Sequence, residues 1–300
     1  MNTIKLGVIG MSEGNGHPYS WSAICNGYVA EDMASCGFPV IPRYLAQQSW
    51  PEARIPGVEV THVWTQDDAL SRHIAQAALI SHVVDKPTAM LGQIDALLLA
   101  RDDAENHLSF AAPFLEAGVP VYIDKPIAHS LEGLRALYQL QRYEGQIFTC
   151  SALRYAKELV MGLADRERIG AVRHVQASTP NSWEKYAVHI IEPVLNLVGQ
   201  TPLIATAQAR RIAENGRALS LAFEGGITGD FMALGKTVAA PLSMRVHGEH
   251  GWHDLVFVDS FSAFRSALIE FIEGVKARSC RSPLSFNEQV VAIIESGLRA

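Results

Sequence analysis

The sequence predicts two parts: a doubly wound α/β domain, then an α+β domain with a mostly antiparallel, open-faced sheet. Short apolar runs alternate with amphipathic stretches as far as residue 151, which is typical of a parallel sheet covered by helices. Between residues 203 and 258, strand-like stretches follow one another with few helical signals, which indicates antiparallel pairing. We therefore expect one domain over 1–125 and another over 126–300.

The first domain is expected to start with a buried strand over residues 4–10 and a helix from Tyr19 to Met33. Four prolines in residues 37–57 predict an irregular insertion. The remaining strands are apolar runs, expected at 58–64, 96–100 and 119–123. The helices between them are expected at 69–78 and 102–117, and a helix at 131–143 and a strand at 146–151 mark the junction.

The second domain is expected to contain helices at 156–165 and 188–198, with a strand from residue 171 between them. Five further strands are expected at 205–211, 218–223, 229–234, 242–247 and 254–258. Two helices close the chain, at 262–276 and 286–298, and the last is a candidate to pack back on the first domain. An open sheet face needs cover, so we expect a homodimer or homotetramer through this sheet.

Composition excludes several classes of protein. The formal net charge is −6 and lysines and arginines are not clustered, which argues against nucleic acid as a partner. The sequence has no uninterrupted run of about 18 apolar residues, so we expect no membrane span. The first residues lack a signal-peptide pattern. The four cysteines are scattered without a CxxC pair, so we expect reduced thiols and a cytoplasmic protein.

A glycine-rich segment, Gly10-Met11-Ser12-Glu13-Gly14-Asn15-Gly16-His17, follows the first strand. In a dinucleotide-binding turn, glycines let the backbone approach the pyrophosphate, and the following helix N-terminus supplies N–H donors. The position fits, but Ser12 stands where a second glycine is usual. The candidate cofactor contacts are Gly10, Ser12, Gly14, Gly16 and His17. An ordinary turn between strand and helix is the alternative.

Polar side chains also follow the second strand, at Gln66, Asp67 and Asp68. A carboxylate at this strand end commonly accepts hydrogen bonds from the adenosine ribose. Gln66 and Asp67 are therefore candidate cofactor contacts, and Asp67 favours NAD, although nearby Arg72 leaves NADP open. The alternative is that Asp67 and Asp68 only cap the next helix.

Lys125 is the sharpest single candidate for chemistry. It follows a buried strand, and ligands of open α/β sheets bind at the carboxyl ends of strands. Pro126 restricts Lys125 to extended backbone conformations and so sets its direction. A lysine there can hydrogen-bond both a cofactor ribose and a substrate hydroxyl, whereas an isolated strand-end lysine is usually a surface residue.

The segment Asp124-Lys125-Pro126-Ile127-Ala128 resembles the Glu-Lys-Pro-like signature of the Gfo/Idh/MocA oxidoreductase family, which includes glucose-fructose oxidoreductase and inositol dehydrogenase. Residues 95–100 resemble the preceding strand of that family, and residues 168–173 its Gly-x-Val entry to the C-terminal sheet. Residues 186–192 resemble its histidine-bearing helix, and residues 264–271 its late phenylalanine-containing helix. The resemblance extends along nearly the whole chain.

This resemblance implies a Rossmann-type first domain that binds NAD or NADP, and an oxidoreductase acting on CH–OH groups of a sugar-like or polyol substrate. Lys125 would contact substrate and nicotinamide ribose, and His189 would exchange the proton at the reacting oxygen. The family often has an aspartate four residues before this histidine, where the present chain has Lys185. Glu192, one turn after His189, is expected to orient the imidazole instead.

The remaining candidate substrate contacts precede or follow His189, and they are Trp183, Lys185, Tyr186 and Glu192. Trp183 either stacks on a pyranose ring or covers the edge of the core. The histidines from His247 to His253 are interrupted by glycines, so we expect a turn there and no metal site. A non-catalytic sensor or scaffold of the same fold is the alternative function, because the glycine loop is irregular and the usual aspartate is missing.

Overall fold

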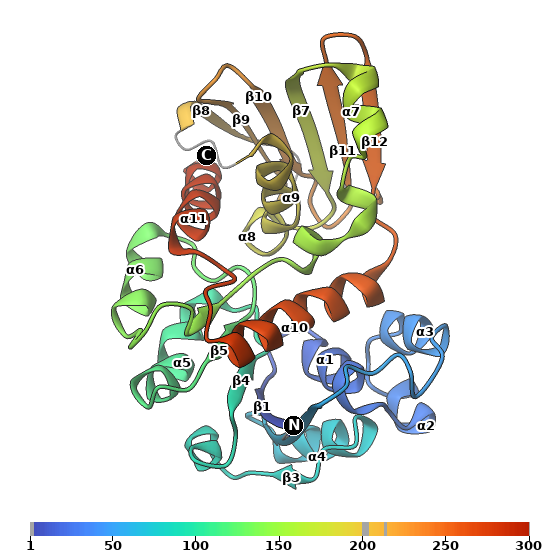
Figure 1. The fold of residues 1–300 in the computed structure, drawn as a ribbon, viewed down its shortest axis with the longest axis vertical. Coiled ribbons are helices and arrows are strands. Elements are labelled where there is room, and N and C mark those ends of the chain that lie inside the picture. Colours follow the sequence, from blue (N-terminus) through green and yellow to red (C-terminus); the bar gives the residue numbers. More distant parts are fainter. Residues whose placement is uncertain (1–2, 200–203, 213–214, 300) are drawn as a thin grey trace. The chain divides into compact units, whose positions relative to one another are not determined.

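The computed structural model describes residues 3–199, 204–212 and 215–299 and divides into two compact units (Figure 1). The first unit comprises Met1–Ile127, Arg135–Thr149 and Phe264–Ser282. The second comprises Ala128–Leu134, Cys150–Ala263 and Pro283–Ala300. The chain thus crosses between units more than once, and the segment that rejoins the first unit is Phe264–Ser282 rather than the last helix.

The first unit is built on a six-stranded parallel sheet in the order β3-β2-β1-β4-β5-β6. The strands are β1 Ile4–Ile9, β2 Val58–Trp64, β3 His82–Val83, β4 Ala96–Leu99, β5 Val121–Ile123 and β6 Ile147–Phe148. The doubly wound α/β prediction is therefore confirmed. The strand order reverses direction between β1 and β4, and ligands of such sheets bind at the carboxyl edge beside this point.

The helices of the first unit correct two sequence predictions. They are α1 His17–Asn26, α2 Ala30–Ala34, α3 Val40–Ala46, α4 Asp68–Ala77, α5 His107–Glu116 and most of α10 Ser260–Ala277, with 3₁₀ turns η1 Pro87–Met90 and η2 Ala104–Asn106. The single helix expected from Tyr19 to Met33 is broken, because Gly27 adopts a φ of 89° and ends α1. The insertion expected to be irregular contains α3, whose buried face is formed by Ile41, Tyr44 and Leu45.

Aromatic side chains join α1 and α10 to the sheet. Tyr122 on β5 stacks on Trp21 of α1 with ring centroids 4.6 Å apart. Phe271 of α10 packs against the rings of Tyr122 and Phe148. Because Phe271 packs on two rings of the sheet, the late helix α10 is part of the core of the first unit, although it is distant in sequence.

The second unit contains a six-stranded sheet in the order β12-β11-β7-β10-β9-β8. The strands are β7 Val172–Thr179, β8 Ile204–Arg211, β9 Arg217–Phe223, β10 Thr228–Ala233, β11 Ser243–Gly248 and β12 Trp252–Val256. Every pair is antiparallel except β7 with β10, which confirms the mostly antiparallel prediction. The histidine-rich segment forms the expected turn, between β11 and β12.

Helices cover one face of this sheet, as Figure 1 shows for α8, α9 and α11. The helices are α7 Leu163–Ile169, α8 Trp183–Tyr186, α9 Val188–Val198 and α11 Leu284–Leu298. α9 packs on β7 and β11, α11 on β8 and β9, and α8 on β10. The helix expected at 156–165 is replaced by 3₁₀ turns at Ala152–Tyr155 (η3) and Lys157–Leu159 (η4), because Gly162 is extended and α7 starts only after it.

The junction elements are shorter than expected: helix α6 spans Leu131–Gln139, and the last parallel strand, β6, spans two residues. Within the described ranges, no helix has the length and apolar character needed to cross a bilayer.

Candidate functional site

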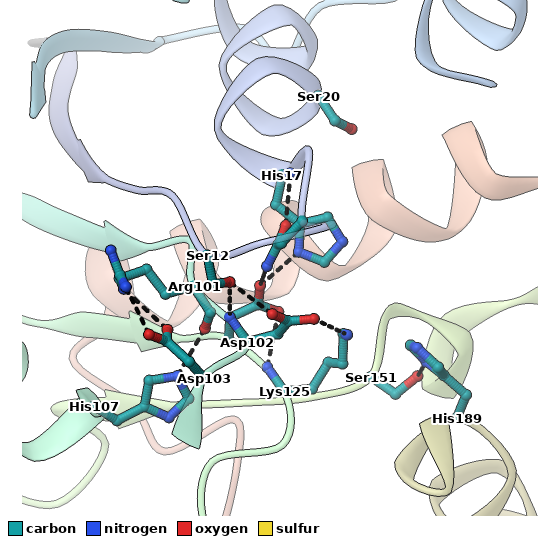
Figure 2. Close-up of polar contacts among 12 residues, drawn as sticks. Ser12, His17, Ser20, Arg101, Asp102, Asp103, His107, Lys125, Ser151 and His189 are labelled. Carbon is teal, nitrogen blue, oxygen red and sulfur yellow. Dashed lines mark hydrogen bonds and ion pairs between the residues drawn. The ribbon is translucent and has the colours of Figure 1, made fainter. Parts of the chain in front are cut away.

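Three neighbouring strands of the first unit present polar side chains at their carboxyl ends. The glycine-rich loop follows β1, the segment from Arg101 to Asp103 follows β4, and Asp124 and Lys125 follow β5. Because β1, β4 and β5 are adjacent in a parallel sheet, these three segments meet at one edge. Figure 2 shows the polar contacts that join them.

The glycine loop is closely packed on the protein side and open at its tip. A Cβ atom on Gly16 would lie 2.6 Å from Ile41 and 2.8 Å from Phe38, so this position has no room for a side chain. Gly14 has a φ of 78° and no heavy atom within 4 Å of its Cβ direction. The loop tip therefore leaves room for a phosphate group beside backbone N–H donors, directly before the first turn of α1.

Ser12 has a specific role that explains why it replaces a glycine. Its hydroxyl donates to Asp102 Oδ1 over 2.6 Å and accepts from the Asp102 amide over 2.9 Å. The other carboxylate oxygen of Asp102 lies 3.5 Å from Lys125 Nζ. All three side chains are buried, so Asp102 links the glycine loop to the lysine within a poorly solvated cluster.

Asp124 is a second buried anchor for the loop. Its Oδ2 accepts from Asn15 Nδ2 over 2.7 Å and contacts His17 Nδ1 at 2.6 Å, and its Oδ1 accepts from the Lys125 amide. The His17 ring stacks on Trp21 with centroids 4.8 Å apart. His17 is therefore fixed by protein contacts at the start of α1.

Gln66 and Arg101 hold the first residue of the loop. The Gln66 amide accepts from the Met11 N–H and donates to the Met11 carbonyl, and Arg101 donates to Gln66 Oε1 over 3.1 Å. Arg101 also pairs with Asp103 at 2.6 Å. Burial raises the pKa of Asp103, but hydrogen bonds from Arg101 and Asn106 outweigh that effect and leave the pKa below its ordinary value.

Asp67 performs the capping role that the sequence left as an alternative. Its Oδ1 accepts from the Leu70 amide at the start of α4, and its side chain is exposed at the end of β2. Asp68 pairs instead with Arg72 over 2.8 Å on the surface of α4. The Arg72 guanidinium is therefore engaged by a carboxylate.

The second unit contains a cluster around His189, at the start of α9. His189 Nδ1 lies 2.7 Å from the hydroxyl of Ser151 (Figure 2). The Tyr186 ring packs edge-on against the imidazole, with ring centroids 5.3 Å apart. Glu192 does not take the expected orienting role: its Oε2 accepts from the Ser151 amide over 2.9 Å and from Arg154 Nε over 2.8 Å. Both carboxylate contacts are buried, which also corrects the expectation that Glu192 binds substrate.

Trp183 belongs to the core of the second unit. Its side chain is fully buried at 0% exposure, and its Nε1 donates to the Ile294 carbonyl over 2.9 Å. The Gly297 backbone of α11 lies directly against the indole, where a Cβ would be only 2.2 Å away. This corrects the expectation that Trp183 stacks on a sugar, whereas Lys185 and Tyr186 are half-buried on α8.

Sequence reasoning missed Asp102, Ser151 and Arg154. Asp102 follows a buried strand, as Lys125 does, so the strand-end argument could have found it. Ser151 caps the 3₁₀ turn η3 and Arg154 lies within it, between the strand expected at 146–151 and the helix expected at 156–165. No local pattern marks them as partners of α9.

Residues 38–151 match the family model described as "Oxidoreductase family, NAD-binding Rossmann fold", named GFO_IDH_MocA. These residues include β2, β4, β5, Asp102 and Lys125. Over this segment, the chain is similar to the Gfo/Idh/MocA oxidoreductase family. The family resemblance inferred from Asp124-Lys125-Pro126 is thereby confirmed, together with an NAD-binding Rossmann fold.

Solved structures match the Gfo/Idh/MocA fold over both units. GenD2 from gentamicin A biosynthesis, in complex with NAD, has a TM-score of 0.75 and 16% identity, and the match covers 100% of this chain and 94% of that one. Myo-inositol dehydrogenase from Lactobacillus casei, in complex with NAD(H) and myo-inositol, has a TM-score of 0.71 and 17% identity, and the match covers 98% of this chain and 93% of that one. Myo-inositol 2-dehydrogenase from Lactobacillus plantarum has a TM-score of 0.72 and 14% identity, and the match covers 99% of this chain and 97% of that one. No curated protein matches the sequence significantly.

Proposed function

We propose that the chain is an NAD-dependent oxidoreductase that transfers hydride between nicotinamide and a hydroxyl or carbonyl carbon of a polyol or sugar-like substrate. The observation that carries the proposal is the buried Lys125, held beside Asp102 and the glycine loop at the carboxyl edge of the parallel sheet. The dinucleotide would supply the hydride chemistry, and the protein would supply positioning and proton transfer.

The residues of the first unit fit a dinucleotide. The open tip at Gly14 and the first turn of α1 would hold the pyrophosphate, with Gln66 and the exposed Asp67 at the end of the neighbouring strand. Asp67 can accept hydrogen bonds from ribose hydroxyls, and the Arg72 guanidinium is directed to Asp68 on the surface of α4. We therefore favour NAD over NADP.

Lys125 and His189 are the proposed catalytic residues. The Lys125 ammonium lies beside Asp102 at the carboxyl edge of the sheet, and an ammonium there can donate to substrate and ribose hydroxyls. His189 is half-buried, and a histidine exchanges a proton near neutral pH. The non-catalytic sensor is not favoured, because the irregular loop is explained by the Ser12 contact with Asp102.

Titration with NADH and NADPH, followed by nicotinamide fluorescence, tests the proposal. We expect NADH to bind more tightly, and Gly14→Val to abolish binding by filling the space at the loop tip. Gly92→Val is the matched control, because Gly92 also has a positive φ and open surroundings but lies in a remote turn. Absence of binding by either dinucleotide would contradict the proposal. Binding without turnover on a panel of inositols and sugars would identify a sensor instead.

We also propose a homodimer or homotetramer formed through the sheet of the second unit. The face opposite α9 and α11 carries Trp252 and Val256, which are 53% and 41% exposed, among small and polar side chains. We expect light scattering to show an oligomer that Trp252→Glu with Val256→Glu dissociates. Val40→Glu, at a 57% exposed site in the first unit, should have no effect. A monomeric wild type would refute this proposal.

The thiols of Cys25, Cys36 and Cys280 are not in disulfides, which supports a cytoplasmic location.

A further inference from the structure

The first turn of α1 uses the backbone N–H groups that would normally bind a phosphate. The N–H groups at a helix N-terminus are the usual donors to the pyrophosphate of a dinucleotide. Here the His17 N–H donates to Asn15 Oδ1 over 2.8 Å, and the Tyr19 N–H donates to the Gly16 carbonyl over 3.1 Å. Pro18, between them, has no N–H. A pyrophosphate beside the glycine loop therefore needs a different donor from this turn.

The His17 side chain is placed to be that donor. Its Nδ1 lies 2.6 Å from Asp124 Oδ2, and its ring stacks on Trp21 (Figure 2). The ring of Phe264 packs edge-on against it, with ring centroids 5.0 Å apart. The side chain nevertheless keeps 16% of its surface exposed. The imidazole is thus held on several sides while one part of it remains accessible beside the glycine loop.

The contacts of Asp124 decide which nitrogen of His17 faces the protein. Asp124 Oδ2 accepts from Asn15 Nδ2, and Oδ1 accepts from the Lys125 N–H, so both oxygens act as acceptors, as in an ionised carboxylate. His17 Nδ1 therefore donates to Oδ2. In the part of the chain that the structure describes, His17 Nε2 has no partner of its own. Nε2 is the nitrogen left for a ligand.

The charges at this edge of the sheet favour a cation at His17. The other two strand-end carboxylates, Asp102 and Asp103, each lie beside a lysine or an arginine. Asp124 is fully buried, and His17 is the one described group within ion-pair distance of it that can become positive. The α1 dipole opposes a cation here, whereas Asp124 and a bound pyrophosphate both favour it. A protonated imidazole has an N–H at each nitrogen, one for the carboxylate and one for the phosphate.

We propose that His17, oriented by Asp124, donates from Nε2 to the pyrophosphate of the dinucleotide, in place of the backbone N–H groups that α1 uses internally. Asp124 acts through His17 and is therefore a positioning residue. The inference rests on the proposed function and extends it, because it names the side chain that takes the phosphate. The acidic residue of the Asp124-Lys125-Pro126 segment would then serve cofactor binding, and the lysine beside it the reaction.

Calorimetric titration of the full-length protein with NADH, ADP and adenosine tests the inference. An asparagine amide can lie where Nδ1 lies, so His17→Asn keeps a donor for Asp124 but removes Nε2. We expect this variant to bind NADH and ADP about 10- to 100-fold more weakly than wild type, the loss expected when a hydrogen bond to a charged group is removed. Adenosine has no phosphate, so its affinity should not change. Asp124→Asn, which leaves an acceptor but no charge beside the ring, should show a smaller loss that is also confined to NADH and ADP.

His62→Asn is the matched control, because His62 is a half-buried histidine of β2 whose Nδ1 contacts the Thr61 hydroxyl over 2.8 Å. It should bind all three ligands as wild type does, and thermal unfolding checks that each variant is folded. Full affinity of His17→Asn for NADH and ADP, or an equal loss for adenosine, would overturn the inference. An unprotonated Nδ1 at His17 in ¹⁵N-histidine spectra of the ligand-free protein would also overturn it.

The same titrations separate this inference from the proposed function. If wild type bound ADP but neither NADH nor NADPH, and His17→Asn lost the ADP, the proposed function would be rejected and the role of His17 in binding phosphate would stand. If wild type bound NADH and His17→Asn bound it equally well, only the role of His17 would be rejected.

Discussion

Replacing Lys125 with methionine should lower kcat/KM by about 10²- to 10⁴-fold, the range expected when a residue that handles a proton or a developing charge is removed. Methionine retains much of the aliphatic stem but removes the ammonium beside Asp102. NADH binding should persist, because the glycine loop keeps its contacts with Asp102 and Asp124. Steady-state kinetics on a polyol that the wild type oxidises, together with NADH titration, measure both effects.

Two further variants make the Lys125 result interpretable. Lys86→Met removes an exposed lysine of the same unit and should leave turnover unchanged. Lys125→Arg keeps the positive charge beside Asp102, so the cluster stays neutralised, but its planar guanidinium places the donors differently and should not restore activity. Wild-type turnover in Lys125→Met would remove this residue from the catalytic assignment.

Replacing Arg154 with methionine should destabilise the second unit by about 3–5 kcal/mol, the usual cost of leaving one member of a buried ion pair alone. Burial raises the pKa of the Glu192 carboxyl, and Arg154 and the Ser151 amide oppose that rise. Without the guanidinium, the carboxyl must either remain charged in the core or take up a proton. Thermal and urea unfolding of the full chain measure the loss of stability.

A double variant separates the ion pair from the packing of Arg154 on the Phe286 ring, which lies 4.2 Å away. Arg154→Met with Glu192→Gln removes both charges while the glutamine can still accept from the Ser151 amide, so we expect most of the stability to return. The exposed pair of Arg72 and Asp68 is the comparison, and Arg72→Met should leave the unfolding temperature unchanged. If Arg154→Met were as stable as wild type, the buried pair would not anchor η3.

Elements with a strong local pattern could be predicted from the sequence. The helix at Val188–Val198 has the predicted bounds, and the strand at Val58–Trp64 was also expected there. The errors occur where the pattern is apolar but interrupted, as at Gly27 and Gly162. There, one residue's backbone conformation breaks a helix that the surrounding side chains would otherwise support.

The candidate site divides in a similar way. Lys125 could be placed because it follows a buried strand, and the same argument would have reached Asp102. The role of Trp183 could not be predicted, because its local sequence is the same whether the indole contacts a substrate or packs in the core under α11. Only the approach of Gly297 to the indole shows that this side chain is in the core.

The sequence by itself determined the class of fold, the parallel order of strands and helices in the first unit, and the strand end that carries Lys125. These features depend on periodicity and on turn residues, which act over a few positions. Only the tertiary structure decided the partners: Ser12 and Lys125 for Asp102, and Ser151 for His189. Hydrogen-bond partners are decided by which strands and helices become neighbours, and Ser12 meets Asp102 across 90 residues because β1 lies beside β4.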